Sequence, residues 1–156
     1  MDNDARALAA FRTSWEYADA YVSEDDVLAD ARSRAADVGC VPILPGGGAA
    51  LRLLAALLDA RSVVEIGTGT GVSGLYLLRG MRADGVLTSV DIEAEHHRHA
   101  REVFLAEGGP AARARLITGR ALEVLPRLAD AAYDIVLVDA AKDEYADYVE
   151  QAARLL

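Results

Sequence analysis

The chain has 156 residues, a formal net charge of −9 at pH 7 and one cysteine. This length is typical of a single domain with a buried core, and 25 acidic against 16 basic side chains exclude the basic surface of a nucleic-acid-binding protein. A lone cysteine excludes a disulfide framework, and the sequence shows neither a signal peptide nor an apolar run that could cross a membrane, so we expect a cytoplasmic protein.

The sequence predicts an N-terminal helical segment over residues 1–40. Aromatic residues among charges at its start predict helices, and the only tryptophan, Trp15, packs either on a partner subunit or in the core. Ser23 and the three acids after it predict the cap and first turn of a second helix, which Gly39 ends. Cys40 has no histidine near it in the sequence, so we expect a small buried apolar residue rather than a nucleophile.

A loop and an apolar helix follow this segment. Residues 41–48 include two prolines and three consecutive glycines, a composition typical of a loop. Residues 49–59 are predicted to form a helix with leucines on one broad face, which leads directly into a strand. The loop around Val41 either lines a ligand pocket or is a simple linker, and the pattern leaves both alternatives open.

A strand, a glycine-rich turn and a helix are predicted next. Residues 62–66 are short and rich in β-branched side chains, as in a buried strand, and four glycines occur in residues 67–74. Without a Cβ atom, glycine lets the backbone come close to a ligand. This order is typical of the first half of a nucleotide-binding βαβ unit.

Two cofactor classes compete for this turn. Residues 69–74 match the dinucleotide pattern Gly-x-Gly-x-x-Gly, which would indicate an NAD-dependent oxidoreductase. However, the first glycine after the strand is Gly67, and counting from it places Val72 where the last glycine is required. The run is better described as Glu-x-Gly-x-Gly-x-Gly, which resembles motif I of the class I S-adenosylmethionine-dependent methyltransferases.

The charge of the turn favours the second class. A dinucleotide has a pyrophosphate, so its glycine turn must favour an anion. S-adenosylmethionine has no phosphate but carries an ammonium and a sulfonium group, which suit the nearby carboxylate of Glu65.

Three more strands are predicted, at 86–90, 115–118 and 133–139, alternating with helices at 93–107, 122–128 and 143–156. Pro126 is expected to shorten the second of these helices. Ligands of open α/β sheets bind beyond the carboxyl ends of the strands, where the sequence places Glu65, Asp91 and Asp139. We therefore expect three acids on one rim, with Asp91 suited to the two ribose hydroxyls of a nucleoside.

The helix over 93–107, which Gly108, Gly109 and Pro110 end, carries three histidines. His96 and His99 are three residues apart and could share a helix face. No carboxylate or cysteine is placed to complete a metal site with them, so we expect a solvent-facing surface.

From Ser23 to Leu156 the chain resembles the cation-dependent O-methyltransferase family, which includes catechol and caffeoyl-coenzyme A O-methyltransferases and many small bacterial enzymes. The resemblance rests on Ser73 and on the runs VEIGTGTG at 64–71, VDIE at 90–93, GRA at 119–121 and VDAAK at 138–142. It implies an α/β fold with a Rossmann-like doubly wound parallel sheet. We expect one S-adenosylmethionine-binding domain over 1–156, with its core at 60–156.

The resemblance also implies roles for single residues and a reaction. Asp91 would bind the ribose, Ile92 and Ala121 the adenine, Asp139 a metal and the substrate, and Lys142 would deprotonate the acceptor hydroxyl. The methionine part of the cofactor would be held by Val41, Glu65, Gly67, Thr68, Gly69 and Ser73. The implied protein is a homodimer that methylates a hydroxyl of a small, typically aromatic, molecule.

The chain departs from the family pattern at its end. In the family a further strand ends in Asp-Asn and completes a magnesium (Mg²⁺) site, and one carboxylate alone is not such a site. We expect either a fragment or a shortened protein, truncated at the C-terminus, that covers an open sheet edge by association. The alternative function is therefore a cofactor-binding or interaction module that lacks catalysis.

Overall fold

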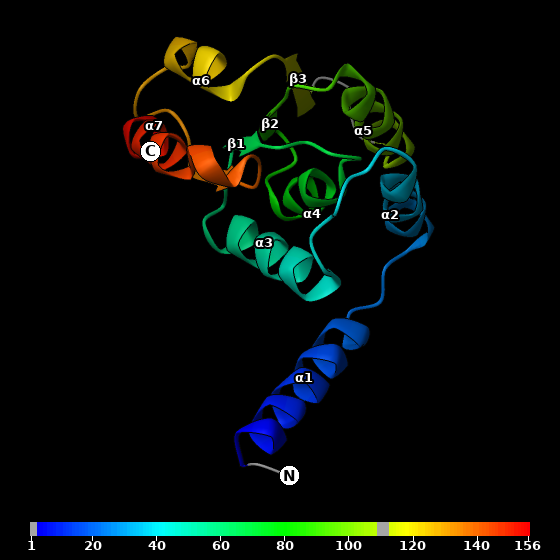
Figure 1. Cartoon of the computed structure of the whole chain (residues 1–156). Helices are drawn as coiled ribbons and strands as arrows, with labels where there is room; N and C mark the ends of the chain where they lie inside the picture. The colour runs from blue at the N-terminus through cyan, green and yellow to red at the C-terminus, as the bar shows by residue number, and fades with distance from the viewer. Residues whose placement is uncertain (1–2, 109–112) are drawn as a thin grey trace.

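The computed structural model describes residues 3–108 and 113–156, in which four parallel strands form one sheet (Figure 1). The order of the strands is β3-β2-β1-β4. The strands are β1 (Ser62–Ile66), β2 (Val86–Asp91), β3 (Ala114–Thr118) and β4 (Ile135–Val138). The register pairs Glu65 with Ser89 and with Leu137. The predicted doubly wound parallel sheet is confirmed.

Helices cover both faces of this sheet. One core lies between the sheet and α2 (Asp26–Asp37), α3 (Pro45–Leu57), α4 (Val72–Gly80) and α5 (Ala94–Ala106). The other core lies under α6 (Ala121–Val124), the 3₁₀ helix η2 (Leu125–Arg127) and α7 (Tyr145–Leu155). The short 3₁₀ helix η3 (Lys142–Glu144) precedes α7.

Alternation along β1 divides its side chains between these two cores. Val63 belongs to the core on the α4 side, whereas Val64 and Ile66 belong to the core under α6 and α7. Because successive side chains of a strand point to opposite faces, Glu65 lies on the same side as Val63. Glu65 therefore faces α4.

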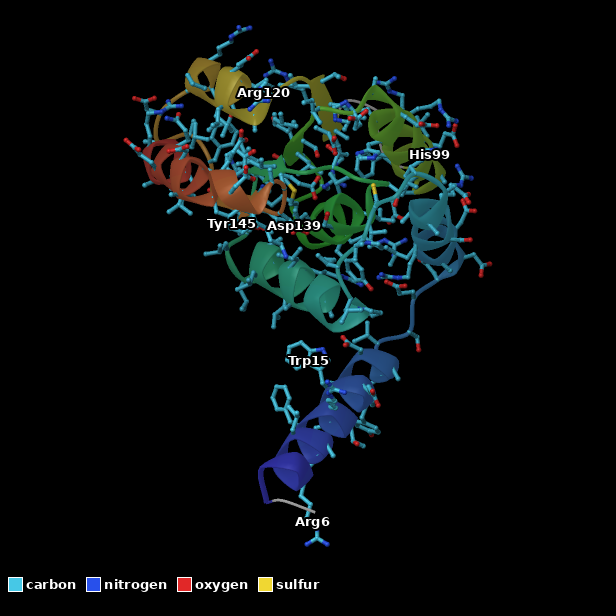
Figure 2. All side chains as sticks on the ribbon, viewed as in Figure 1. Arg6, Trp15, His99, Arg120, Asp139 and Tyr145 are labelled. Carbon is cyan, nitrogen blue, oxygen red and sulfur yellow. The ribbon has the colours of Figure 1, made fainter. Side chains whose placement is uncertain are left out.

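The helix α1 (Asn3–Tyr21) extends away from the sheet, beyond α3 (Figure 1). Trp15 projects from it with 57% of its surface exposed (Figure 2), so packing of Trp15 in the core of this chain is wrong. Much of the predicted apolar face of α3 is also open to solvent, since Leu57 is 72% exposed, whereas Leu51 packs against the core. Within 3–108 and 113–156, no helix combines the length and apolar character that crossing a membrane requires.

Several helix boundaries differ from the sequence predictions. Asp25, not Ser23, is the cap of α2, and its carboxylate accepts a hydrogen bond of 3.1 Å from the Leu28 amide. Pro45 begins α3, because a proline in the first turn loses no helical hydrogen bond, so part of the expected loop is helical. Pro126 lies in η2 after α6 has ended, as expected. Gly109 and Pro110 lie outside the described residues.

Candidate functional site

A cavity of about 380 Å³ opens beside the glycine turn, at the carboxyl ends of β1, β2 and β4. This volume lies in the range of small-molecule sites. Of the residues singled out from the sequence, the cavity is lined by Val41, Gly67, Thr68, Gly69, Ser73, Asp91, Ile92, Ala121 and Asp139. Glu65 and Lys142 do not line it.

A larger cavity of about 700 Å³ lies elsewhere, between α4, α5 and β3. Two of its guanidinium groups already have partners: Arg79 binds Glu107 and Asp25, and Arg113 donates to backbone carbonyls. It is also remote from the carboxyl ends of the strands, where ligands of α/β sheets bind. We therefore place the candidate site in the smaller cavity.

The glycine turn requires glycine at Gly67. Its φ of 99° lies in the left-handed region, and a Cβ there would stand 2.1 Å from the carbonyl oxygen of Asp139. The turn and the segment after β4 are thus in direct backbone contact. Asp139 itself is exposed and lies where the chain leaves β4 toward α7 (Figure 2).

The backbone amides of the turn already have acceptors within the protein. The amides of Thr68 and Gly69 donate to Asp91 Oδ2 at 2.9 and 3.0 Å. The Gly67 amide donates to the Val90 carbonyl, and the Gly71 amide donates to the Thr68 carbonyl. These four donors therefore do not form a free anion-binding nest of the kind that a pyrophosphate needs.

Asp91 is the acceptor at the centre of this arrangement. Besides the two turn amides, it accepts from the Glu93 amide at 2.9 Å and from His96 Nδ1 at 3.0 Å. Burial acts to raise the pKa of Asp91, but the bonds from Glu93, Gly69 and His96 outweigh it and hold that pKa below its ordinary value. The carboxylate is therefore ionised, and it lines the cavity.

Cys40 lies close to a histidine in space, which the sequence did not indicate. Its Sγ is 3.2 Å from His96 Nε2, on the far side of the ring from Asp91. Burial raises the pKa of the Cys40 thiol, and the Asp91 charge adds to the effect. His96 Nδ1–H therefore donates to the Asp91 carboxylate, while its Nε2 contacts the Cys40 thiol. Cys40 is half-buried and lines the cavity, so the prediction of a simple buried apolar residue is wrong.

Glu65 lies beneath the glycine turn and not on the rim, so the expected rim of three acids is wrong at this residue. It is 0% exposed and accepts from Ser73 Oγ and Ser89 Oγ, both at 2.5 Å. Burial raises its pKa to about 7, the two serine bonds act in the opposite direction, and the charges of Asp139 and Asp91 add to the rise.

The histidines of α5 do not form the expected solvent-facing surface. His97 and His99 are 4% and 9% exposed, and His96 is half-buried. His97 bonds to Thr68 Oγ1 at 3.0 Å and to Thr118 Oγ1 at 2.8 Å. Over 3–108 and 113–156, no three His, Cys, Asp or Glu side chains are grouped to hold a metal ion.

Some lining residues were missed in the sequence. Glu144 and Tyr148 line the cavity, and the Tyr148 hydroxyl and Arg120 both donate to the Glu144 carboxylate. Two residues four apart share a face of a helix, so these positions could have been noted once the helix after Asp139 was assigned.

The loop before α3 is a wall of the cavity, which decides between the two alternatives for the segment around Val41. Arg32 donates to the Ile43 carbonyl at 2.8 Å and is held in turn by Glu24 at 2.6 Å. The loop is thus fixed from α2, although Val41 itself is 92% exposed.

Residues 20–156 match the model of a family described as O-methyltransferase. A Mycobacterium tuberculosis (strain H37Rv) protein named as an O-methyltransferase is 54% identical over 142 residues, which are 91% of this chain and 63% of that protein. The chain thus spans less than two thirds of that relative's length.

Two crystal structures with 31% identity have the same fold. A Corynebacterium glutamicum protein superposes with a TM-score of 0.87 over 94% of this chain and 69% of its own. The O-methyltransferase TomG from Streptomyces achromogenes, involved in tomaymycin synthesis and solved in complex with SAM, gives a TM-score of 0.80 over 99% of this chain and 70% of its own.

Proposed function

Since the chain belongs to the O-methyltransferase family, we propose that it binds S-adenosylmethionine and transfers the methyl group to a hydroxyl of a small aromatic acceptor. One observation carries the proposal: the cavity presents carboxylates, while four amides of its glycine turn are already satisfied. Such a lining suits a cation-bearing nucleoside without phosphates. In this proposal residues 1–156 act as one cofactor-binding domain, with 1–40 as its N-terminal segment and 60–156 as its core.

Different residues would hold the ribose, the adenine and the methionine part of the cofactor. Asp91 would accept from the ribose hydroxyls, because its carboxylate is ionised and lines the cavity. Ile92 and Ala121 would flank the adenine. The methionine part would lie along Val41, Gly67, Thr68, Gly69 and Ser73. Glu65 would act on the cationic groups through its charge from below the turn, since it does not reach the cavity.

The chemistry is an in-line displacement at the methyl carbon. An acceptor oxygen forms a bond to that carbon while the carbon–sulfur bond breaks, and the electron pair remains on the sulfur of the neutral S-adenosylhomocysteine. The protein must hold the oxygen in line with the methyl group and exclude water, because charge is lost as phenolate and sulfonium react. Asp139 would bind the acceptor, and Lys142 would take the hydroxyl proton as a neutral amine, once the bound acceptor excludes water from it.

A magnesium-dependent step does not fit the donors present. Asp139 is the single carboxylate at the position that the resemblance assigns to the metal, and no group of three ligands occurs over 3–108 and 113–156. Magnesium needs an octahedral set of oxygen ligands. The donors present therefore support no step through a metal ion.

Calorimetric titration tests the proposal. We expect the chain to bind S-adenosylmethionine and S-adenosylhomocysteine and to show no measurable heat with NAD⁺. Preferential binding of NAD⁺ would favour the dinucleotide alternative. If the chain binds the cofactor but fails to methylate any member of a catechol panel, the non-catalytic binding module takes the place of the enzyme.

Asp91→Asn is expected to weaken S-adenosylmethionine binding about tenfold or more, because ribose hydroxyls lose a charged acceptor. The measurement is the dissociation constant by calorimetry. Glu150→Gln, which removes one charge from an exposed residue outside the cavity lining, is the matched control and should bind as the wild type does. An Asp91→Asn variant with wild-type affinity would refute the ribose assignment.

We also propose that the chain forms a homodimer through α1 and α3. Exposed apolar side chains gather on these helices: Leu8, Phe11, Trp15, Tyr17 and Tyr21 on α1, and Leu53, Leu54 and Leu57 on α3 with Leu58 directly after it. Exposed apolar surface of this kind marks association sites. The dimer, like a cytoplasmic location, is a prediction made from the sequence.

Trp15→Glu is expected to convert this dimer into a monomer, because a charge would be buried in the interface. Light scattering coupled to size-exclusion chromatography measures the mass. Glu16→Ala, at the neighbouring exposed position, is the control and should leave the dimer intact. A monomeric wild-type chain would contradict the proposal.

A further inference from the structure

A chain of side-chain hydrogen bonds runs from the α4 side of the sheet, where its members are buried, to the exposed Thr118 at the end of β3. Ser89 Oγ bonds to Glu65 Oε2 at 2.5 Å and to Thr68 Oγ1 at 2.6 Å. Thr68 Oγ1 also bonds to His97 Nε2 at 3.0 Å, and His97 Nδ1 bonds to Thr118 Oγ1 at 2.8 Å. We call these five residues the polar chain.

The ionised form of Glu65 fixes the direction of every bond in this chain. A carboxylate can only accept hydrogen bonds, so Ser89 donates its single hydroxyl proton to Glu65. Ser89 must then accept a hydrogen bond from Thr68. Thr68 then has no proton left and must accept from His97 Nε2–H. A neutral His97 carries no second proton, so its Nδ1 accepts from the Thr118 hydroxyl. The arrangement thus selects one tautomer of His97.

His97 is neutral in this setting. Burial lowers its pKa, and the charges of Arg101 and His96 lower it further. The negative charge of Asp91 acts in the opposite direction and raises the pKa. The imidazole therefore does not neutralise Glu65. What it supplies is a donor on one side and an acceptor on the other.

The two hydrogen-bond partners of His97 belong to different segments around the cavity. Thr68 lies in the glycine turn and lines the cavity. Thr118 ends β3, directly before Gly119, which lines the cavity with Ala121. The same Thr68 donates its amide to Asp91. His97 thus connects these two segments through its two ring nitrogens.

We propose that His97 is a positioning residue, which acts through Thr68 and Ser89 to hold the Glu65 carboxylate ionised beneath the cationic centre of the bound cofactor. The inference rests on the proposed function, because it needs S-adenosylmethionine in the cavity. It predicts an effect on charge recognition as well as on affinity. Without the donor at Nε2, Thr68 is free to reverse its hydroxyl, and Ser89 no longer has a fixed proton to give to Glu65.

The comparison of two ligands separates charge recognition from general damage. S-adenosylmethionine carries a positive sulfonium, whereas S-adenosylhomocysteine has a neutral sulfur and is otherwise alike. Loss of one buried negative charge several ångströms away should reduce the preference for the sulfonium by about fivefold. If the role of His97 were purely structural, its replacement would weaken the binding of both ligands equally and leave the ratio of their dissociation constants unchanged.

The experiment measures both dissociation constants at pH 8, where Glu65 is ionised, for wild type, His97→Leu and His97→Gln. We expect His97→Leu to lower the preference for S-adenosylmethionine about fivefold, and His97→Gln to restore most of it, because its amide offers a donor and an acceptor. His99→Leu is the matched control: it removes a buried histidine of the same helix that is outside the polar chain, and it should keep the wild-type ratio.

Thr68→Val provides a second test if His97→Leu does not fold, because it breaks the same chain with a side chain of similar shape and should also lower the ratio. An unchanged ratio in a folded His97→Leu or Thr68→Val variant would overturn the inference while the proposed function stands. If the wild type binds neither ligand, the proposed function fails and the inference fails with it.

Discussion

The Glu65→Gln variant is expected to bind S-adenosylmethionine about tenfold more weakly than the wild-type chain at pH 8. Its affinity for S-adenosylhomocysteine should fall less, because that ligand carries no sulfonium charge. Glutamine has nearly the same shape, so Ser73 and Ser89 keep a partner, but the negative charge beneath the cavity is gone. Calorimetric titration of both ligands measures the effect. An equal loss of affinity for the two ligands would contradict the role assigned to the Glu65 charge.

The same variant should show the opposite effect on stability. The folded-state pKa of Glu65 is about 7, above its ordinary value of 4.5, so the folded chain binds this proton more tightly than the unfolded chain. The free energy of unfolding of the wild type is therefore expected to fall by roughly 3 kcal/mol as the pH rises from about 4.5 to about 7, and to level off above that.

Glu65→Gln cannot titrate and should lack this decline. Urea unfolding of both proteins at pH 5 and at pH 8 tests the difference, because all other titrating groups are shared. The variant should gain stability relative to the wild type between these two pH values. A pH dependence identical in the two proteins would show that Glu65 titrates normally when folded.

Gly67→Ala is expected to prevent stable folding or to cost roughly 3–5 kcal/mol, the combined cost of a strained left-handed residue and a clash in a packed site. The new Cβ would stand 2.1 Å from the Asp139 carbonyl oxygen, and that contact is with backbone, which cannot move aside as a side chain can. The turn and the segment after β4 would have to separate.

Gly69→Ala is the matched control. It also has a positive φ, 50°, but its Cβ would first meet Cys40 Sγ at 3.6 Å, an ordinary contact. The expected cost is therefore only about 1 kcal/mol, from the left-handed backbone alone. Thermal unfolding of the two variants compares the costs, and similar midpoints would refute the account of the Gly67 contact.

The sequence was sufficient for the sheet and for most of the cavity. Periodicity and glycines located all four strands, and two acids at strand ends line the cavity: Asp91, the last residue of β2, and Asp139, directly after β4. These predictions work because strand ends in a parallel sheet share one edge, which the order of the chain alone determines. The same reasoning was wrong for Glu65, which does not line the cavity. It lies one residue before the end of β1, and the alternation of side chains along the strand turns it toward α4.

Contacts between segments that are distant along the chain could not be predicted from the sequence. Cys40 and His96 are 56 residues apart, and only the folded chain brings them together. The buried histidines of α5 were missed for a similar reason, since the polar partners that make burial of His97 tolerable come from other elements. Helix starts shifted by a few residues because Asp25 competes with Ser23 as a cap and Pro45 can enter a first turn.

A crystal structure of the chain grown with S-adenosylhomocysteine tests the central claim most directly. We predict that the nucleoside occupies the cavity beside the glycine turn, with both ribose hydroxyls against the carboxylate of Asp91 and the amino acid part over Gly67 and Gly69. A ligand bound elsewhere on the chain, or one in this cavity with its ribose turned away from Asp91, would contradict the account.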